Sequence, residues 1–72
     1  MTDSKPQSPK PTAIHKARLA AGLTQTEAAQ VVRASLRGWQ QWEAGDRAMP
    51  PGLFALFMLK TGQWPLESNT GK

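Results

Sequence analysis

The chain has 72 residues, enough for one small domain. It contains no cysteine, so disulfide bonds, thiolate zinc sites and cysteine nucleophiles are excluded. Nine Lys or Arg against five Asp or Glu give a net charge of +4, which suits a polyanionic partner without requiring one.

The N-terminus is polar and proline-rich, unlike a secretory signal, and no apolar run is long enough to cross a bilayer. We therefore expect a soluble cytoplasmic protein. His15 is the only histidine and the acidic residues are scattered singly, so no metal or cofactor is expected. No nucleophile–base pair, paired carboxylates or phosphate-cradling glycine loop appears, so we expect no enzyme activity and see no small-molecule site.

The first helix is predicted to follow a polar tail. Residues 1–11 are rich in Pro and Ser and predict a disordered segment. Thr12 is the predicted N-cap of a helix over residues 13–21, and Gly22 is a suitable residue to end it. Apolar residues at helical spacing give this helix an inward stripe, formed by Ile14, Ala17 and Ala21.

Two further helices are predicted from their capping residues. Thr24, followed three positions later by Glu27, fits a capping box and predicts a helix over residues 25–32. Ser35 is the predicted N-cap of a third helix, residues 36–44, which a glycine ends.

The fourth predicted helix is apolar in almost every direction. Pro51 sits at the first position of a helix over residues 51–61. One core stripe cannot absorb all its apolar side chains. Residues 67–72 are predicted to be a flexible C-terminus. The expected fold is an all-α, compact four- to five-helix bundle over residues 12–66.

The second and third predicted helices, joined by a tight turn, match a helix-turn-helix arrangement. In that arrangement the later helix enters the major groove, while the N-terminus of the earlier one attracts a phosphate. Trp39 and Trp42 could then be either a recognition surface or core. Because they lie three apart on one helix face and polar residues occupy the other side, we interpret them as core.

The segment "GLTQTEAAQVV" followed by "WQQWEAG" resembles the lambda-repressor-like, or XRE, helix-turn-helix family. Residues 23–45 match the family pattern without a gap, and the likeness extends over about residues 13–62. Residues 33–45 are also similar to small phage and mobile-element repressors of the anti-CRISPR-associated kind. One departure is Arg33, which stands where the family usually has a glycine at the turn. Either Arg33 adopts a costly left-handed conformation, or the turn has another shape.

The resemblance implies roles for individual residues. Major-groove contacts would come from the exposed side of the third helix, with an arginine reading guanine and glutamines reading adenine: Leu36, Arg37, Gln40 and Gln41. Phosphate contacts would come from Thr24, Gln25, Arg33 and Arg47, although solvated surface is the alternative for the two arginines. Arg18 and Glu43 occupy the positions of a structural ion pair that ties the first helix to the third.

A homodimer is expected, because one short helix reads too few base pairs for useful specificity. The proposed interface uses the surplus apolar residues, namely Leu53, Phe54, Phe57, Met58, Trp64 and Leu66. In the alternative, the C-terminal residues fold back over the fourth helix and the chain is monomeric. The leading hypothesis is a DNA-binding transcriptional repressor of its own operon acting on double-stranded palindromic DNA. The alternative is an antitoxin-like or other protein-interaction module.

Overall fold

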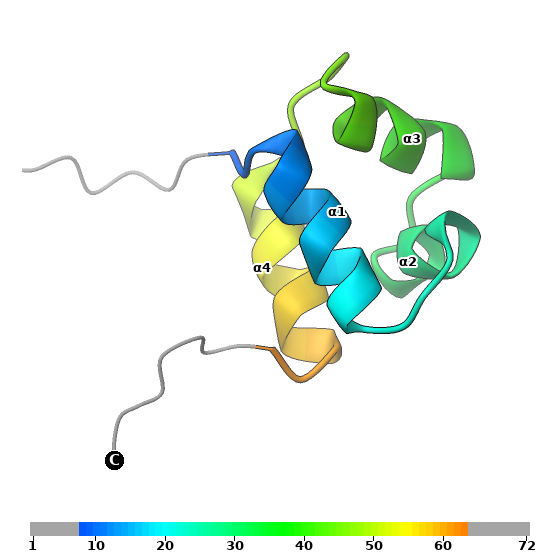
Figure 1. Ribbon diagram of the computed structural model, residues 1–72, viewed down its shortest axis with the longest axis vertical. Coiled ribbons are helices and arrows are strands. Elements are labelled where there is room, and N and C mark those ends of the chain that lie inside the picture. The colour runs from blue at the N-terminus through cyan, green and yellow to red at the C-terminus, as the bar shows by residue number, and fades with distance from the viewer. Residues whose placement is uncertain (1–7, 64–72) are drawn as a thin grey trace, which may run out of the picture.

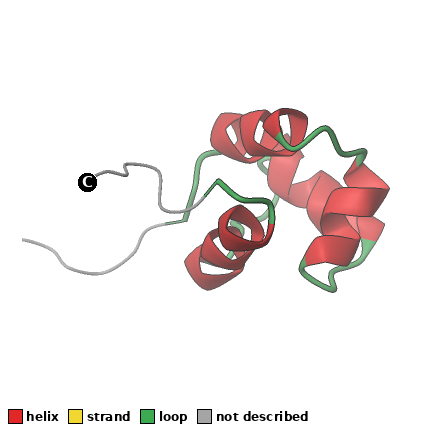
Figure 2. Ribbon diagram, turned by 90° about the horizontal axis from the view of Figure 1, so that it is seen from below, coloured by secondary structure: helices red, strands yellow, loops and turns green. Residues whose placement is uncertain are grey.

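The computed structural model describes residues 8–63, which fold into helices without any strand (Figures 1 and 2). The four helices are α1 (Pro11–Ala20), α2 (Gln25–Val31), α3 (Leu36–Ala44) and α4 (Pro51–Lys60). The predicted all-α class is therefore confirmed, and residues 8–63 contain no fifth helix. Helix α3 packs against both α1 and α2, and α2 also contacts α4. Within this part of the chain, no helix combines the length and the apolar character needed to cross a membrane.

Side-chain caps fix where α2 and α3 begin. The Thr24 hydroxyl accepts a hydrogen bond from the Glu27 backbone N–H at 3.1 Å, and the Glu27 carboxylate accepts one from the Thr24 N–H at 2.9 Å. Ser35 caps α3 by accepting from the Gly38 N–H at 3.0 Å. The predicted capping box and the predicted Ser35 cap are both confirmed.

The predicted cap of the first helix is wrong. Helix α1 begins at Pro11, inside the segment expected to be tail, and Thr12 lies within its first turn. Lys10 occupies the N-cap position and makes no side-chain cap bond. A proline at the first helical position needs no N–H partner and has a helical φ already, so it starts the helix without a capping hydroxyl.

All four described helices end in the same hydrogen-bonded turn, in which one residue takes a left-handed conformation. That residue is a glycine after three of them: Gly22 after α1, with φ 73°, Gly45 after α3, with φ 84°, and Gly62 after α4, with φ 78°. After α2 it is Arg33, with φ 58°. The N–H of Ala34 then bonds the Ala29 carbonyl at 2.8 Å. Of the two alternatives left by the sequence, the structure has the strained arginine, with α2 ending one residue earlier than predicted.

Replacing Arg33 with glycine is expected to raise the free energy of unfolding by about 1 kcal/mol, because glycine accepts positive φ without steric cost. The Arg33→Ala variant is the matched control, since it removes the same charge and keeps the strain. Urea unfolding followed by circular dichroism measures both. A glycine variant no more stable than the alanine variant would show that the turn carries no strain.

The tryptophans of α3 face inward and fill the centre of the molecule. Trp39 is 0% exposed and Trp42 is 9% exposed, with their ring centroids 5.7 Å apart in an edge-to-face arrangement. The Trp39 ring also packs on Phe57 of α4 at 5.0 Å. Small residues on α1 and α2 leave room for these rings: Ala17, Ala28 and Ala29. The interpretation of both tryptophans as core is confirmed.

Candidate nucleic-acid interface

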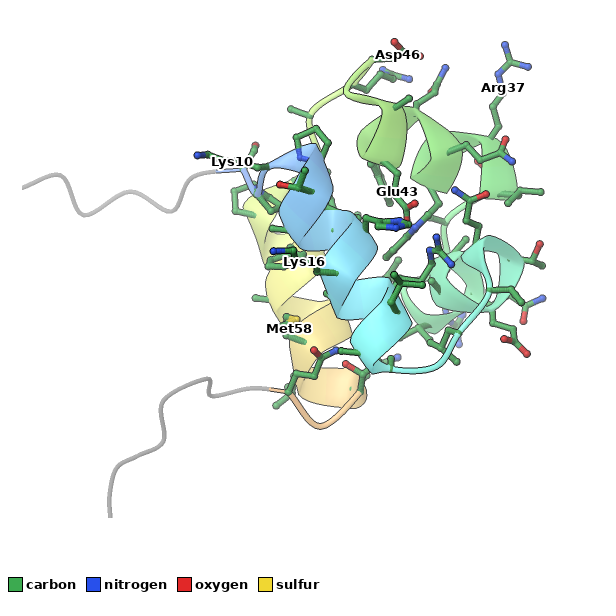
Figure 3. All side chains as sticks on the ribbon, viewed as in Figure 1. Lys10, Lys16, Arg37, Glu43, Asp46 and Met58 are labelled. Atoms are coloured by element: carbon green, nitrogen blue, oxygen red, sulfur yellow. The ribbon has the colours of Figure 1, made fainter. Side chains whose placement is uncertain are left out.

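The face of α3 opposite the tryptophans is polar and open to solvent. Leu36, Arg37 and Gln40 are exposed, and Gln41 is half-buried. The Arg37 side chain projects away from the body of the molecule, as does Asp46 just beyond the end of the helix (Figure 3). The four predicted base-reading residues therefore share one side of α3, because positions spaced by one, three and four residues surround a single helical face.

Part of this face forms a shallow hollow of about 280 Å³. Arg37, Gln40 and Gln41 line it together with Ala44 and Asp46. The hollow combines a guanidinium, two amides and a carboxylate, so it offers both donors and acceptors to a ligand. Asp46 had no predicted role, and it places a negative charge at the C-terminal end of a face that is otherwise neutral or positive.

Glu43 lies on the inward side of α3, and its carboxylate accepts hydrogen bonds from side chains of three helices. Arg18 of α1 donates through Nε to Glu43 Oε2 at 2.6 Å and through a terminal nitrogen to Oε1 at 3.2 Å. Trp39 donates its indole N–H to Oε2. Gln25 of α2 donates to Oε1 at 3.2 Å. The ion-paired carboxylate thus fixes the orientation of α3 against both α1 and α2.

The Glu43 side chain is 8% exposed and that of Arg18 is 13% exposed, so the pair is largely removed from water. Burial by itself raises the pKa of Glu43. The hydrogen bonds from Arg18, Trp39, His15 and Gln25 outweigh burial and lower the pKa from 4.5 to about 2. Glu43 is therefore ionised throughout the neutral range, and the Arg18 guanidinium also bonds the Leu23 carbonyl at 3.1 Å, just before α2.

Gln25 connects this buried cluster to the exposed face. Its amide nitrogen donates to Glu43, while its amide oxygen accepts from the Gln40 side chain at 3.4 Å. A chain of polar contacts therefore runs from Arg18 through Glu43 and Gln25 to Gln40. One N–H of the Gln25 amide is left over, so the predicted phosphate contact is compatible with this arrangement.

The other predicted phosphate-binding residues lie on the surface around α2 and α3. Thr24, Arg33 and Arg47 are all exposed. Thr24 accepts the capping bond through its oxygen, so its hydroxyl hydrogen remains available as a donor. The two arginines flank α3 in the chain, and neither is part of an ion pair among residues 8–63.

The predicted dimer interface requires correction. Phe57 is 0% exposed and Met58 is 5% exposed, so both belong to the core of their own chain. The physical reason is that Phe57 packs beneath the Trp39 ring. Leu53 and Phe54 are half-buried against the same core. Trp64 and Leu66, with the predicted C-terminus, lie outside the described residues.

Three members of the Glu43 cluster were missed by the sequence reasoning. His15 is exposed, and its Nδ1 also lies 3.1 Å from Glu43 Oε1, a contact that the sequence did not predict. The partners of the Trp39 indole and the Gln25 amide with Glu43 were not foreseen either. The spacing of two pairs could have predicted part of this cluster. His15 and Arg18 are three residues apart and Trp39 and Glu43 are four apart, so the side chains of each pair share a helix face.

A search of protein-family models and a search of curated proteins find no match to this chain.

Proposed function

We propose that the protein is a sequence-specific DNA-binding transcriptional repressor that inserts α3 into the major groove. The observation that carries this proposal is the division of α3 into two faces: buried tryptophans on one side, and Arg37, Gln40 and Gln41 on the other. Helices α2 and α3 with their four-residue connection serve as the helix-turn-helix unit.

In this proposal the polar face of α3 recognises base edges. Arg37 lies in the first turn of α3, where a side chain reaches deepest into the groove. Two N–H groups of its guanidinium can donate hydrogen bonds to O6 and N7 of one guanine. Gln40 and Gln41 offer the paired donor and acceptor that suit adenine. The contact between Gln25 and Gln40 limits the rotamers of Gln40, so less conformational freedom is lost on binding.

Phosphates on either side of the groove would meet Thr24 and Gln25 at the N-terminus of α2, and Arg33 and Arg47 around α3. These groups supply affinity without sequence preference, and binding weakens as salt rises. The Glu43 carboxylate does not repel the DNA phosphates, because it is paired with the Arg18 guanidinium inside the molecule.

The proposed dimer uses the outward face of α4. Gly52, Leu56 and Leu59 are spaced at i, i+4 and i+7 and therefore share one face of the helix. Gly52 and Leu59 are exposed, while Leu56 is half-buried and also packs against the core. Leu59 is 59% exposed, and Gly52 allows another helix to approach closely. An apolar stripe of this kind is self-complementary across a two-fold axis. Two copies would then bind half-sites of an inverted repeat.

Replacing Leu59 with glutamate is expected to convert a dimer into a monomer and to weaken binding to a palindromic site by at least about tenfold. The Leu19→Glu variant on α1 is the matched control, because Leu19 is 55% exposed and is not proposed to contact a partner. Sedimentation gives the mass of each variant. If wild type and Leu59→Glu are both monomeric, the α4 dimer is refuted and the stripe is left for a different protein partner, as in the antitoxin-like alternative.

Selection of bound sequences from random duplex DNA tests the proposed function itself. The expected result is one enriched inverted repeat whose half-sites lie about one helical turn apart. Repression of the protein's own operon predicts that this repeat also occurs upstream of its gene. Binding without any enriched sequence would refute specific recognition.

A further inference from the structure

An apolar groove lies between α1 and α4. Its volume is about 360 Å³ and its lining is almost entirely apolar. Helix α1 contributes Ala13, Lys16, Ala17 and Ala20, and helix α4 contributes Phe54 and Met58. Lys16 and Met58 lie on the opposite side of the molecule from Arg37, so the groove is separate from the proposed DNA-binding face (Figure 3).

The α1 wall of this groove consists of alanines. Ala13, Ala17 and Ala20 recur at the spacing of one helix face, and a methyl group is the largest apolar side chain that α1 offers there. The groove is open to solvent, and its apolar lining is therefore left in contact with water unless another apolar group covers it. A bulky apolar group would complete the packing.

The chain itself leads into this groove. After α4, the left-handed Gly62 reverses the chain, and the Gln63 N–H bonds the Met58 carbonyl at 2.8 Å. Gln63 forms part of the groove wall, and its side-chain amide donates to the Ala17 carbonyl of α1 at 3.1 Å. The last described residue is therefore fixed at the groove, and Trp64, Pro65 and Leu66 come next.

We propose that Trp64, Pro65 and Leu66 of the same chain occupy the groove between α1 and α4. Three extended residues span about 10 Å. The seven-residue rise from Ala13 to Ala20 is also about 10 Å. Trp64 and Leu66 supply the large apolar side chains that the alanine wall leaves room for. Glu67, the one acidic residue after Gln63, then comes within reach of Lys16 at the rim.

This docking has a consequence for α3. Helix α1 carries Arg18 and His15, both of which bond Glu43. A segment wedged between α1 and α4 holds α1 in place, and through Glu43 it steadies α3. The sequence had assigned Trp64 and Leu66 to the dimer interface, whereas this proposal places them in the core of their own chain and leaves the outward face of α4 free.

Nuclear Overhauser effects in the full chain test the proposal directly. We expect contacts between the Trp64 indole protons and the methyl groups of Ala13, Ala17 and Ala20. A sample mixing isotope-labelled and unlabelled chains separates the possible occupants. Contacts between chains would mean that a second copy fills the groove, and the absence of any such contact would mean that Trp64 lies elsewhere. Either result overturns the proposal.

A double-mutant cycle gives a second, independent measurement. Trp64→Ala is expected to lower the folding equilibrium constant by about tenfold or more, as for loss of a buried aromatic side chain. Ala20→Glu places a charge in the groove, and in that background Trp64→Ala is expected to change the constant by less than about twofold. Equal losses in both backgrounds, or no loss in wild type, would contradict the docking. The groove is not part of the DNA-binding face, so this outcome is independent of the proposed function.

Discussion

Replacing Glu43 with alanine is expected to lower the free energy of unfolding by about 3 kcal/mol, which is a large fraction of the stability of so small a domain. The substitution leaves the Arg18 guanidinium and the Trp39 indole N–H largely buried without their acceptor. It also removes the link between α1, α2 and α3. Chemical denaturation, followed by tryptophan fluorescence, measures the loss.

Two variants serve as controls for this result. Glu43→Gln keeps the shape and an acceptor oxygen, so it is expected to be less damaging than alanine. Glu27→Ala removes an exposed carboxylate that only closes a capping box, and it should cost about 1 kcal/mol. Equal effects of Glu43→Ala and Glu27→Ala would show that the buried cluster contributes no more than a surface cap.

The same carboxylate predicts how stability depends on pH. The pKa of Glu43 is about 2 in the folded chain against 4.5 for a free side chain. A lowered pKa means that the unfolded chain binds the proton more readily. The contribution is therefore fully present above about pH 4.5 and is lost as the pH falls toward 2, by about 3 kcal/mol at 1.4 kcal/mol per pKa unit. Glu43→Gln is expected to flatten this part of the stability profile, and an unchanged profile would contradict the assignment.

The Arg37→Ala variant is expected to lose about 1–3 kcal/mol of binding free energy on its selected DNA site, with relaxed preference at one base position in each half-site. Arg37 is exposed and Figure 3 shows it pointing away from the protein, so its removal should leave the fold intact. Titrations on the selected duplex and on random duplex of equal length give the two affinities.

Arg47→Ala is the matched control, since it removes the same charge from the chain after α3. It is expected to weaken both duplexes alike and to lower the slope of log affinity against log salt by about 1. If Arg37→Ala also weakens both duplexes equally, Arg37 contacts the backbone and reads no base.

The local signals in the sequence were sufficient for α2, α3 and their caps. Thr24, Glu27 and Ser35 bond their own backbone neighbours, and such short-range contacts depend on spacing alone. The inward position of Trp39 and Trp42 also follows from helical periodicity. The start of α1 was misplaced because a proline at the first helical position competes with a capping threonine in the sequence pattern.

Contacts between residues far apart in the chain could not be predicted from the spacing of residues. Glu43 collects donors that lie 25 and 18 residues away, and no periodic pattern relates them. The surplus of apolar residues on α4 was recognised, but its distribution was not: Phe57 and Met58 turned out to be core, and Leu59 is exposed. Which apolar residue of a nearly all-apolar helix faces inward depends on where the neighbouring helices lie.

We propose that the polar face of α3 binds duplex DNA. Titration of isotope-labelled protein with the selected duplex, followed by amide and side-chain NMR shifts, tests it most directly. We predict the largest changes at Leu36, Arg37, Gln40 and Gln41, with smaller ones at the start of α2 and near-constant signals from the α1–α4 groove. Largest changes on α4 or in that groove, or no change on α3, would contradict the claim.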